Sequence, residues 1–330
     1  MSRTSAPVTA AHGPLRRARV RVPGSSSNLG AGFDCLGIAL ARYVTAEYVP
    51  HHPSHDPSHN AHHDAHALHV ERRGTLRALG EGPDDRDLIV RAFRRYTESL
   101  GIAATGGALT LDSEIPIARG LGSSAAAVVT GIALAAAAAD VPLDLAHALR
   151  IAREFEDHLD NVAPSILGGL VAVANGDDGV PHAFRLPLSD RVGFAFAAPG
   201  VELETRRARA ALPSTVPHAD AVHNVGAMAA LLRALETGDA DLMRLGLSDR
   251  LHVQYRVPLI PGAEDAMRAA RDAGAWGATV SGAGSGLLAF AAPDRTFDVA
   301  DAMAAAFRAA TGTGVVFFAA EPDARGATVE

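Results

Sequence analysis

Residues 118–129, ARGLGSSAAAVV, combine two glycines and two serines with the start of an alanine tract. Gly120 and Gly122 allow the backbone to approach a ligand closely, and Ser123 and Ser124 add two hydroxyls. The alanine tract predicts a helix, whose first N–H groups have no intrahelical acceptor and whose dipole favours negative charge. The pattern therefore predicts an anion site, and phosphate is the anion that it suits best.

Two well-known phosphate loops fit this turn less well. The Walker pattern requires a lysine after the glycines, and the chain contains no lysine at all. The dinucleotide fingerprint fits Gly120, Gly122 and Ala125, but the preceding SEIPIARG carries Pro and Arg where a buried parallel strand is needed. No strand that would complete a βαβ unit is predicted after the helix. A Gly-Ser turn that only caps a helix is the structural alternative.

Apolar periodicity predicts the elements that would position this turn. Strands at 17–24 and 38–49 flank a Gly/Ser/Asn turn, a helix covers 88–100, and a strand at 106–118 leads into the glycines. Beyond the alanine helix we expect a helix from Leu143 to Asp157 that is capped by Asp140. The remaining expected elements are strands at 170–174, 192–198, 277–281, 287–291 and 314–320 and helices at 220–237, 239–251, 263–273 and 297–310. Because strands and helices mix without a regular βαβ alternation, the predicted fold class is α+β.

Length and composition limit the class of protein. A chain of 330 residues exceeds the usual size of a single core, so two domains are expected. A net charge of −7 disfavours a nucleic-acid or anionic-membrane surface, and a single cysteine, Cys35, excludes an internal disulfide and fits a reducing compartment. The N-terminus predicts a short disordered lead without a secretory signal, and no apolar run reaches the about 18 residues of a membrane span. We therefore expect a cytoplasmic protein.

Residues 51–69, HHPSHDPSHNAHHDAHALH, are unlike the rest of the chain. Clustered histidines can bind zinc or nickel, but this run lacks the fixed spacing of a structural metal site and is broken by Pro, Ser, Asp and Asn. The composition favours a surface loop inserted between strands.

Three motifs in order along the chain resemble those of the GHMP kinases. They are VPGSSSNLGAGFDCLG near the N-terminus, the phosphate loop and VSGAGSG near the C-terminus, and they span residues 22–286. The resemblance implies a two-domain fold with a ribosomal S5 domain 2-like domain at 1–175 and a ferredoxin-like domain at 176–330. It implies ATP as the phosphoryl donor, bound along Pro116, Ile117, Ala118, Arg119, Gly120, Leu121, Gly122, Ser123, Ser124, Ala125 and Ala126.

Four further strings resemble the homoserine kinase branch of that superfamily. They are SNLGAGFDCLGIAL, HLDNVAPSILGG, TRRARAALPSTVPHADAVHNV and DRLHVQYRVPLIPG. This resemblance implies phosphorylation of the side-chain hydroxyl of L-homoserine in threonine biosynthesis, with two arginines on the substrate carboxylate, a group that suits the guanidinium fork. The implied substrate-binding residues are Asn28, Asp34, His158, Asn161, Arg209 and Arg256.

The resemblance also implies the metal ligands and the catalytic groups. Ser124 and Glu156 would hold Mg²⁺, with Glu154 as the alternative carboxylate. Asn161 would orient the acceptor hydroxyl, because an amide cannot act as a base at neutral pH. A loose phosphoryl-transfer transition state places little charge on the attacking oxygen, so we expect no enzyme base and expect Asp160 to point elsewhere.

The chain departs from the family pattern in three places, and two other functions compete. Ser285 replaces the usual proline of the third motif, and Asp87 stands where an Asn is usual. The histidine-rich run at 51–69 has no counterpart in the pattern. A mevalonate- or phosphomevalonate-type kinase would carry an Asp base with a Lys partner, and this chain has no lysine. A non-catalytic small-molecule sensor on the same scaffold would lack Glu156 or Ser124. A homodimer is consistent with the family analogy.

Overall fold

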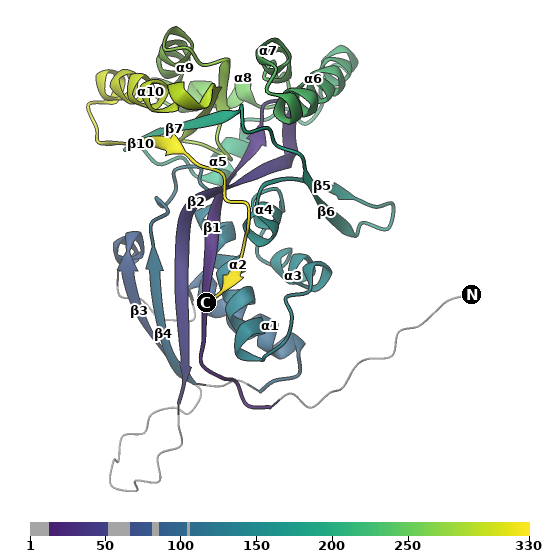
Figure 1. The fold of residues 1–330 in the computed structure, drawn as a ribbon, viewed down its shortest axis with the longest axis vertical. Coiled ribbons are helices and arrows are strands. Elements are labelled where there is room, and N and C mark those ends of the chain that lie inside the picture. Colours follow the sequence, from purple (N-terminus) through teal and green to yellow (C-terminus); the bar gives the residue numbers. More distant parts are fainter. Residues whose placement is uncertain (1–12, 52–66, 81–85, 104–105) are drawn as a thin grey trace, which may run out of the picture.

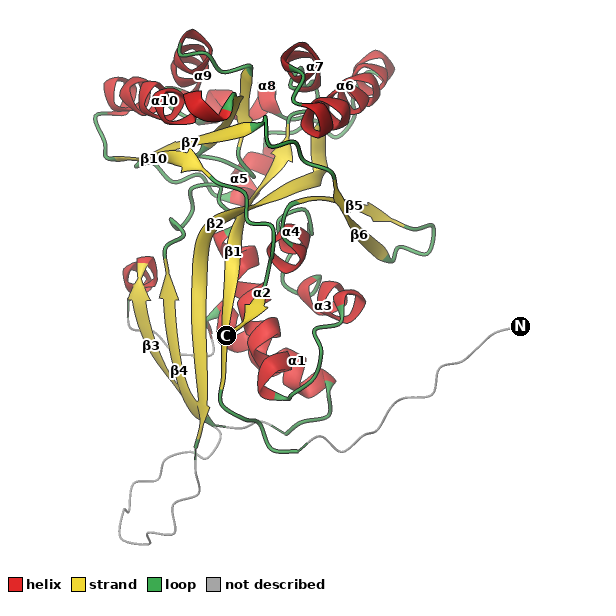
Figure 2. Ribbon diagram, viewed as in Figure 1, coloured by secondary structure: helices red, strands yellow, loops and turns green. Residues whose placement is uncertain are grey.

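Two β-sheets organise the chain in the computed structural model, which describes residues 13–51, 67–80, 86–103 and 106–330 (Figure 1). The first sheet has seven strands with helices on one side, and the second has four strands with helices packed above it (Figure 2). Mixed, mainly antiparallel sheets with helices on one face confirm the α+β prediction. The predicted N-terminal lead and the centre of the histidine-rich segment, residues 52–66, lie outside the described residues.

The seven-stranded sheet is built around one long strand, β2. Residues 44–50 of β2 pair with β4, and residues 36–38 pair with β5, so β2 links two groups of strands. The path runs β11-β1-β2-β4-β3, and the β5–β6 hairpin joins through β2. The strands are β1 (Ala18–Leu29), β2 (Gly32–Pro50), β3 (Leu68–Gly74), β4 (Gly107–Ser113), β5 (Leu170–Asn175), β6 (Pro181–Leu186) and β11 (Thr328–Val329).

The Gly/Ser/Asn stretch that we predicted as a turn is strand. Ser25, Ser26 and Ser27 pair with residues 37–39 of β2, and the chain reverses only at Gly30 and Ala31. All three serines are buried. Their polarity misled the prediction because their hydroxyls bond other buried polar groups instead of water.

Four helices pack beside this sheet: α1 (Leu88–Ser99), α2 (Ser123–Ala138), α3 (Leu145–Ala152) and α4 (Val162–Leu167). Helix α2 is almost entirely buried, which explains its alanine and valine content. The prediction for Leu143–Asp157 was wrong at both ends, since α3 ends at Ala152 and is capped by Asp144, whose carboxylate accepts the His147 N–H at 2.7 Å. Asp140 instead pairs with Arg16 on the surface.

The four-stranded sheet is antiparallel in the order β10-β7-β9-β8. Its strands are β7 (Gly193–Pro199), β8 (Gly277–Val280), β9 (Leu287–Ala291) and β10 (Val315–Ala320). The helices of this half are α5 (Thr205–Ala210), α6 (His218–Thr237), α7 (Ala240–Gly246), α8 (Val253–Arg256), α9 (Ala263–Asp272) and α10 (Thr296–Thr311). Short 3₁₀ turns are η1 (Thr75–Leu79), η3 (Val257–Leu259) and η4 (Pro293–Arg295).

The helix predicted over 239–251 stops early, at Gly246. Asp249 ends it because its carboxylate accepts the N–H groups of His252 and Val253, each at 2.8 Å, and so starts the short helix α8. This turn places Arg256 in the interior, where its side chain is fully buried.

The chain crosses between the two halves more than once. Strand β6 stays with the first sheet, and the C-terminal strand β11 returns to pair with β1 (Figure 1). The division into domains at residues 175 and 176 remains a prediction. Within the described residues, no helix is long and apolar enough to cross a membrane.

Candidate active site

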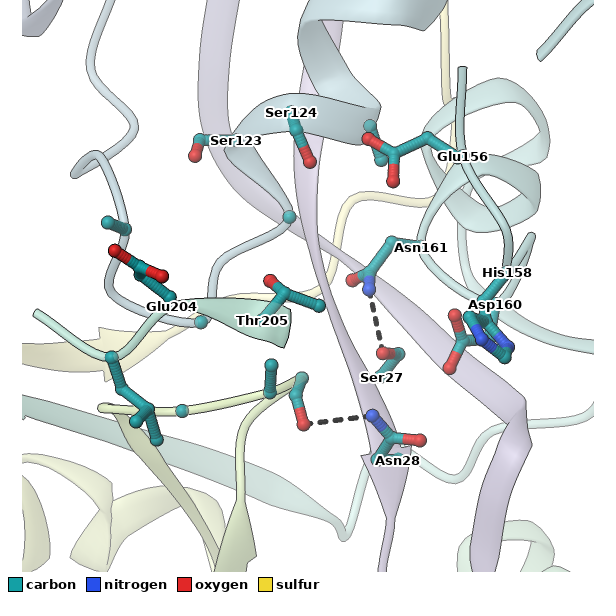
Figure 3. Close-up of a pocket in the computed structure, with 18 of the residues that line it drawn as sticks. Ser27, Asn28, Ser123, Ser124, Glu156, His158, Asp160, Asn161, Glu204 and Thr205 are labelled. Atoms are coloured by element: carbon teal, nitrogen blue, oxygen red, sulfur yellow. Dashed lines mark hydrogen bonds between the residues drawn. The ribbon is translucent and has the colours of Figure 1, made fainter. Parts of the chain in front are cut away.

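A cavity of about 280 Å³ lies where the two halves of the chain meet (Figure 3). It is lined by the end of β1, the start of α2, the loop before α4, α5, α8 and the turn after β8. The cavity brings together most residues expected from the sequence: Asn28, Ile117, Ala118, Gly120, Gly122, Ser123, Ser124, Ala125, Glu156, His158, Asn161, Arg209 and Arg256. The expected residues that do not line it are Asp34, Pro116, Arg119, Leu121 and Ala126.

The three glycine-rich motifs, far apart in the sequence, contact one another at this cavity. Ser281 donates its hydroxyl to the Gly120 carbonyl at 2.5 Å, and its Oγ lies 2.8 Å from that of Ser26. The Gly282 N–H bonds the Ser27 carbonyl at 3.0 Å. The third motif therefore holds the phosphate loop against β1.

The phosphate loop presents the open end of α2. Gly122 is the N-cap in the left-handed region, with φ of 59°, and no side chain caps the first N–H groups. A Cβ on Gly122 would lie 2.4 Å from the Ser25 Oγ and 2.9 Å from the Asn161 Oδ1, so only glycine fits. Arg119 turns aside and donates to the carbonyls of Ala118 and Gly200, which excludes it from the cavity lining.

Ser124 and Glu156 face each other at the start of α2 (Figure 3). Burial raises the pKa of the Glu156 carboxyl, and the hydrogen bond from Ser124 opposes that rise. Glu154 pairs instead with Arg95 at 2.7 and 2.8 Å, outside the cavity. One hydroxyl and one carboxylate beside a phosphate site suit a Mg²⁺ that takes its other ligands from phosphate and water. The described residues contain no cluster of three or more His, Cys, Asp or Glu that could hold a metal alone.

Asn161 is fixed at the centre of the cavity by two serines of β1. Its Oδ1 accepts from the Ser25 hydroxyl at 3.0 Å, and its Nδ2 donates to the Ser27 Oγ at 2.7 Å. The second N–H of the amide is left for a ligand. The carboxamide is thus oriented before any substrate binds.

Asp160 lines the same cavity, contrary to the expectation that it points elsewhere. The side chain is buried, and its Oδ2 has no hydrogen-bond partner among the described residues. Burial and the nearby Asp34 raise its pKa to about 6, against the opposing effects of Ser27, Arg209 and the Asn161 N–H. No local pattern indicates this orientation, because neighbouring residues in a loop can point in any direction.

Asp34 forms an ion pair with Arg209, which lines the cavity. The guanidinium donates to both carboxylate oxygens, at 2.8 and 3.1 Å, and Nδ1 of His158 lies 3.4 Å from the same carboxylate. Burial lowers the pKa of His158. Asn28 supports this corner, since its Oδ1 accepts the Asp34 N–H at 2.8 Å and its Nδ2 donates to the Gly282 carbonyl at 2.8 Å.

Arg256 is a buried cation with spare donors. Its Nη1 bonds the Gly282 carbonyl at 2.9 Å, while Nε and Nη2 have no partner among the described residues. Burial and the neighbouring Arg209 lower its pKa to about 10, so it remains a cation at neutral pH. A buried guanidinium with two free donors at a cavity wall is a ready site for a carboxylate.

Several cavity residues were not expected from the sequence: Ser27, Asp160, Leu203, Glu204, Thr205, Gly282, Ala283 and Gly284. All of them except Leu203 and Glu204 lie inside motifs that we did identify, so motif membership could have signalled them. Of the departures from the family pattern, Asp87 caps α1 and pairs with Arg72 at 2.8 Å, and Ser285 donates to the Val201 carbonyl at 2.6 Å. Both therefore have structural partners outside the cavity.

Comparisons with known proteins show the family to which the chain belongs. The family model of the GHMP kinases N terminal domain matches residues 87–169, and that of the GHMP kinases C terminal domain matches residues 228–310. The homoserine kinase of Gloeobacter violaceus is 41% identical over 285 residues, which are 86% of this chain and 91% of that protein. The homoserine kinase of Thermosynechococcus vestitus is 40% identical over 285 residues, which are 86% of this chain and 89% of that protein.

Solved structures show the same architecture. A homoserine kinase from Cytophaga hutchinsonii superposes with a TM-score of 0.81 at 26% identity, over 95% of this chain and 97% of that one. A putative homoserine kinase from Listeria monocytogenes gives a TM-score of 0.71 at 28% identity, over 94% of this chain and 98% of that one. The fold is that of a two-domain GHMP kinase. Within that class, the chain belongs to the homoserine kinase family.

Proposed function

We propose that this chain transfers the γ-phosphoryl group of ATP to the side-chain hydroxyl of L-homoserine, with Mg²⁺ held by Ser124 and Glu156. The observation that carries the proposal is the pairing, in one cavity, of the uncapped α2 N-terminus with the buried, partly unpaired guanidinium of Arg256. The first suits the phosphates of a nucleotide, and the second suits the carboxylate of an amino acid.

On the nucleotide side, the N–H groups of Ser123, Ser124 and Ala125 bind phosphate oxygens. Mg²⁺, when bound, would screen the negative charge on the phosphoryl group that is transferred. Ser124 and Glu156 would hold it at the helix start, and the hydrogen bond from Ser124 lowers the pKa of Glu156 and so favours the ionised carboxylate that a metal needs. These residues thus act on charge that develops during transfer.

On the acceptor side, homoserine is a zwitterion with a hydroxyl two carbons from its Cα. Arg256, assisted by Arg209, binds the carboxylate, and Asn28, which lines the cavity, offers its Oδ1 as an acceptor for the ammonium. Asn161 uses its remaining N–H to orient the hydroxyl toward the phosphate. Proximity and orientation supply most of the rate in such a reaction.

Purified protein incubated with ATP, Mg²⁺ and a panel of alcohols tests the proposal. ADP release should depend on L-homoserine far more than on mevalonate, galactose or shikimate. Equal turnover with mevalonate would assign the chain to the mevalonate-type alternative, and binding of homoserine without any ADP release would assign it to the sensor alternative.

A further inference from the structure

The aromatic ring of Phe33 contacts both arginines of the candidate active site, although Phe33 does not line the cavity. The guanidinium carbon of Arg256 lies 5.1 Å from the centre of the ring, and that of Arg209 lies 6.0 Å from it. Both distances fall within the roughly 6 Å over which the negative face of an aromatic ring attracts a cation. One ring therefore serves the two cations that the proposed function assigns to the substrate carboxylate.

A second ring, that of His252, supports Phe33. The two rings are stacked, with centres 5.1 Å apart and planes inclined by 20°. His252 is the N-cap of α8 and Arg256 is the last residue of that helix, so one helical turn carries both partners of the Phe33 ring. The His252 Nε2 also lies 3.0 Å from the Gly30 carbonyl, which fixes the ring to the turn between β1 and β2. Burial lowers the pKa of His252 to about 4, so at neutral pH it adds no third positive charge beside the arginines.

The Phe33 ring stabilises Arg256 without using its hydrogen-bond donors. Arg256 is fully buried, and burial and the nearby Arg209 both lower its pKa, so its surroundings disfavour the charge. Asp34 compensates Arg209 by accepting two hydrogen bonds, at 2.8 and 3.1 Å, which use two of the donors of that guanidinium. A ring face attracts a guanidinium through its charge and requires no N–H group for this. The donors of Arg256 are therefore left for a ligand.

No carboxylate does for Arg256 what Asp34 does for Arg209. Asp34, Asp160 and Asp249 lie near enough to raise the pKa of Arg256. Within the described part of the chain, however, the one hydrogen bond of the Arg256 guanidinium runs from Nη1 to the Gly282 carbonyl, at 2.9 Å. Nε and Nη2, the adjacent donors on one edge of the guanidinium, have no partner there. The ring and one carbonyl thus fix the direction of that edge.

We propose that Phe33 is a positioning residue for the acceptor, because its ring face holds the Arg256 guanidinium so that Nε and Nη2 meet the substrate carboxylate in a fixed orientation. The inference rests on the proposed function, in which Arg256 binds that carboxylate. Phe33 acts through Arg256 and does not touch the substrate. The electrostatic attraction of the ring, and not only its volume, therefore sets the affinity for homoserine.

A series of fluorinated side chains separates attraction from volume. Phenylalanines with one, two or three ring fluorines, incorporated at position 33 by genetic-code expansion, weaken the negative ring face stepwise and change its size little. Calorimetry on the full chain, with Mg²⁺ and a non-hydrolysable ATP analogue, gives the dissociation constant for L-homoserine. We expect its logarithm to rise in proportion to the number of fluorines, with a total loss of affinity of about fivefold or more.

Phe33→Leu provides a second measurement, because leucine keeps an apolar side chain and removes the ring face. We expect KM for homoserine to rise about tenfold, while KM for ATP stays the same and kcat changes by less than about threefold. A carboxylate site remote from the reacting oxygen contributes mainly to binding. Phe297 is the matched control, since its ring is exposed and lies outside the cavity lining. Fluorination of Phe297 should leave the dissociation constant unchanged.

The outcomes separate this proposal from the proposed function. Wild-type protein that does not bind homoserine contradicts the proposed function itself. If the wild-type protein binds homoserine and the dissociation constant is the same across the fluorinated series, the role of Phe33 is overturned alone, because ring volume then suffices. Equal weakening of homoserine and of the ATP analogue also overturns it, since the substitutions would then disturb the whole cavity.

Discussion

The Arg209 guanidinium binds both carboxylate oxygens of Asp34, at 2.8 and 3.1 Å. This pair ties α5, in the second half of the chain, to β2 in the first half, at the edge of the candidate active site. A substrate carboxylate must therefore share Arg209 with Asp34, whereas Arg256 has free donors for it. The two arginines are consequently not equivalent.

Replacement of these arginines should affect homoserine more than ATP. Arg256→Lys keeps the buried charge but loses the two-pronged donor geometry, so we expect KM for homoserine to rise about tenfold or more while KM for ATP changes little. Arg209→Ala should raise the KM for homoserine less, because Asp34 already accepts hydrogen bonds from that guanidinium. Steady-state kinetics with each substrate varied provide the measurement, with exposed Arg244→Ala as control. A selective rise in KM for ATP would place the arginines on the nucleotide.

Loss of the metal ligands should affect turnover. Ser124→Ala and Glu156→Gln should each lower kcat by roughly two orders of magnitude at saturating Mg²⁺, since both act on transition-state charge. Glu154→Gln is the matched control, because Glu154 only pairs with Arg95 outside the cavity. Near-normal kcat in both test variants would reassign the turn to helix capping.

Asp160→Asn should stabilise the fold at neutral pH. The folded pKa of about 6 exceeds the unfolded value of 3.8, so the native carboxyl contributes stability below pH 3.8 that is lost as pH rises through 6. The neutral amide removes a penalty of at most about 3 kcal/mol above pH 6 and almost none near pH 4. Urea unfolding at several pH values measures the difference. An equal gain in unfolding free energy near pH 4 and above pH 6 would show that the gain does not come from removal of the buried charge of Asp160.

The buried His252 should make the protein sensitive to acid. Burial lowers its pKa to about 4 from 6.5, so the unfolded chain binds a proton that the folded chain does not. Stability from this group is full above pH 6.5 and falls by about 3 kcal/mol as pH drops to 4. His252→Gln should flatten that decline, and Asp160→Asn should steepen it by removing the opposing contribution. Unfolding free energies at about pH 5 and 7.5 test both expectations.

Gly122→Ala should damage the phosphate loop. The new Cβ would meet the Ser25 Oγ at 2.4 Å in a backbone conformation that favours glycine, so Ser25 and Asn161 must move. We expect kcat to fall by about tenfold or more, because a shift of 1 Å in a positioned group is costly. Gly226→Ala in α6 has nothing within 4 Å of its Cβ and should leave activity unchanged while slightly raising the Tm. Full activity in Gly122→Ala would show that the loop tolerates the displacement.

Local chemistry explains what could be predicted from the sequence. The glycines and serines before the alanine tract indicated the helix start that the structure shows, because φ above zero and bare N–H groups need those residue types. Local caps by Asp144 and Asp249 shifted the predicted helix ends, whereas side chains from elsewhere decided the conformation of the serine stretch. Ser25, Ser26 and Ser27 are strand because Asn161 and Ser281 satisfy their hydroxyls.

The sequence alone thus determined the fold class, the family resemblance and the glycine turn at the start of α2, which all depend on residue types at fixed short spacings. Only the tertiary structure decided that Glu156, not Glu154, faces Ser124, that Asp34 occupies Arg209, and that Asp160 faces the cavity with a free oxygen. Contacts between residues distant in the sequence set these outcomes, such as Arg95 with Glu154 and Asp34 with Arg209. Such long-range contacts fix side-chain direction and pKa, and no local pattern encodes them.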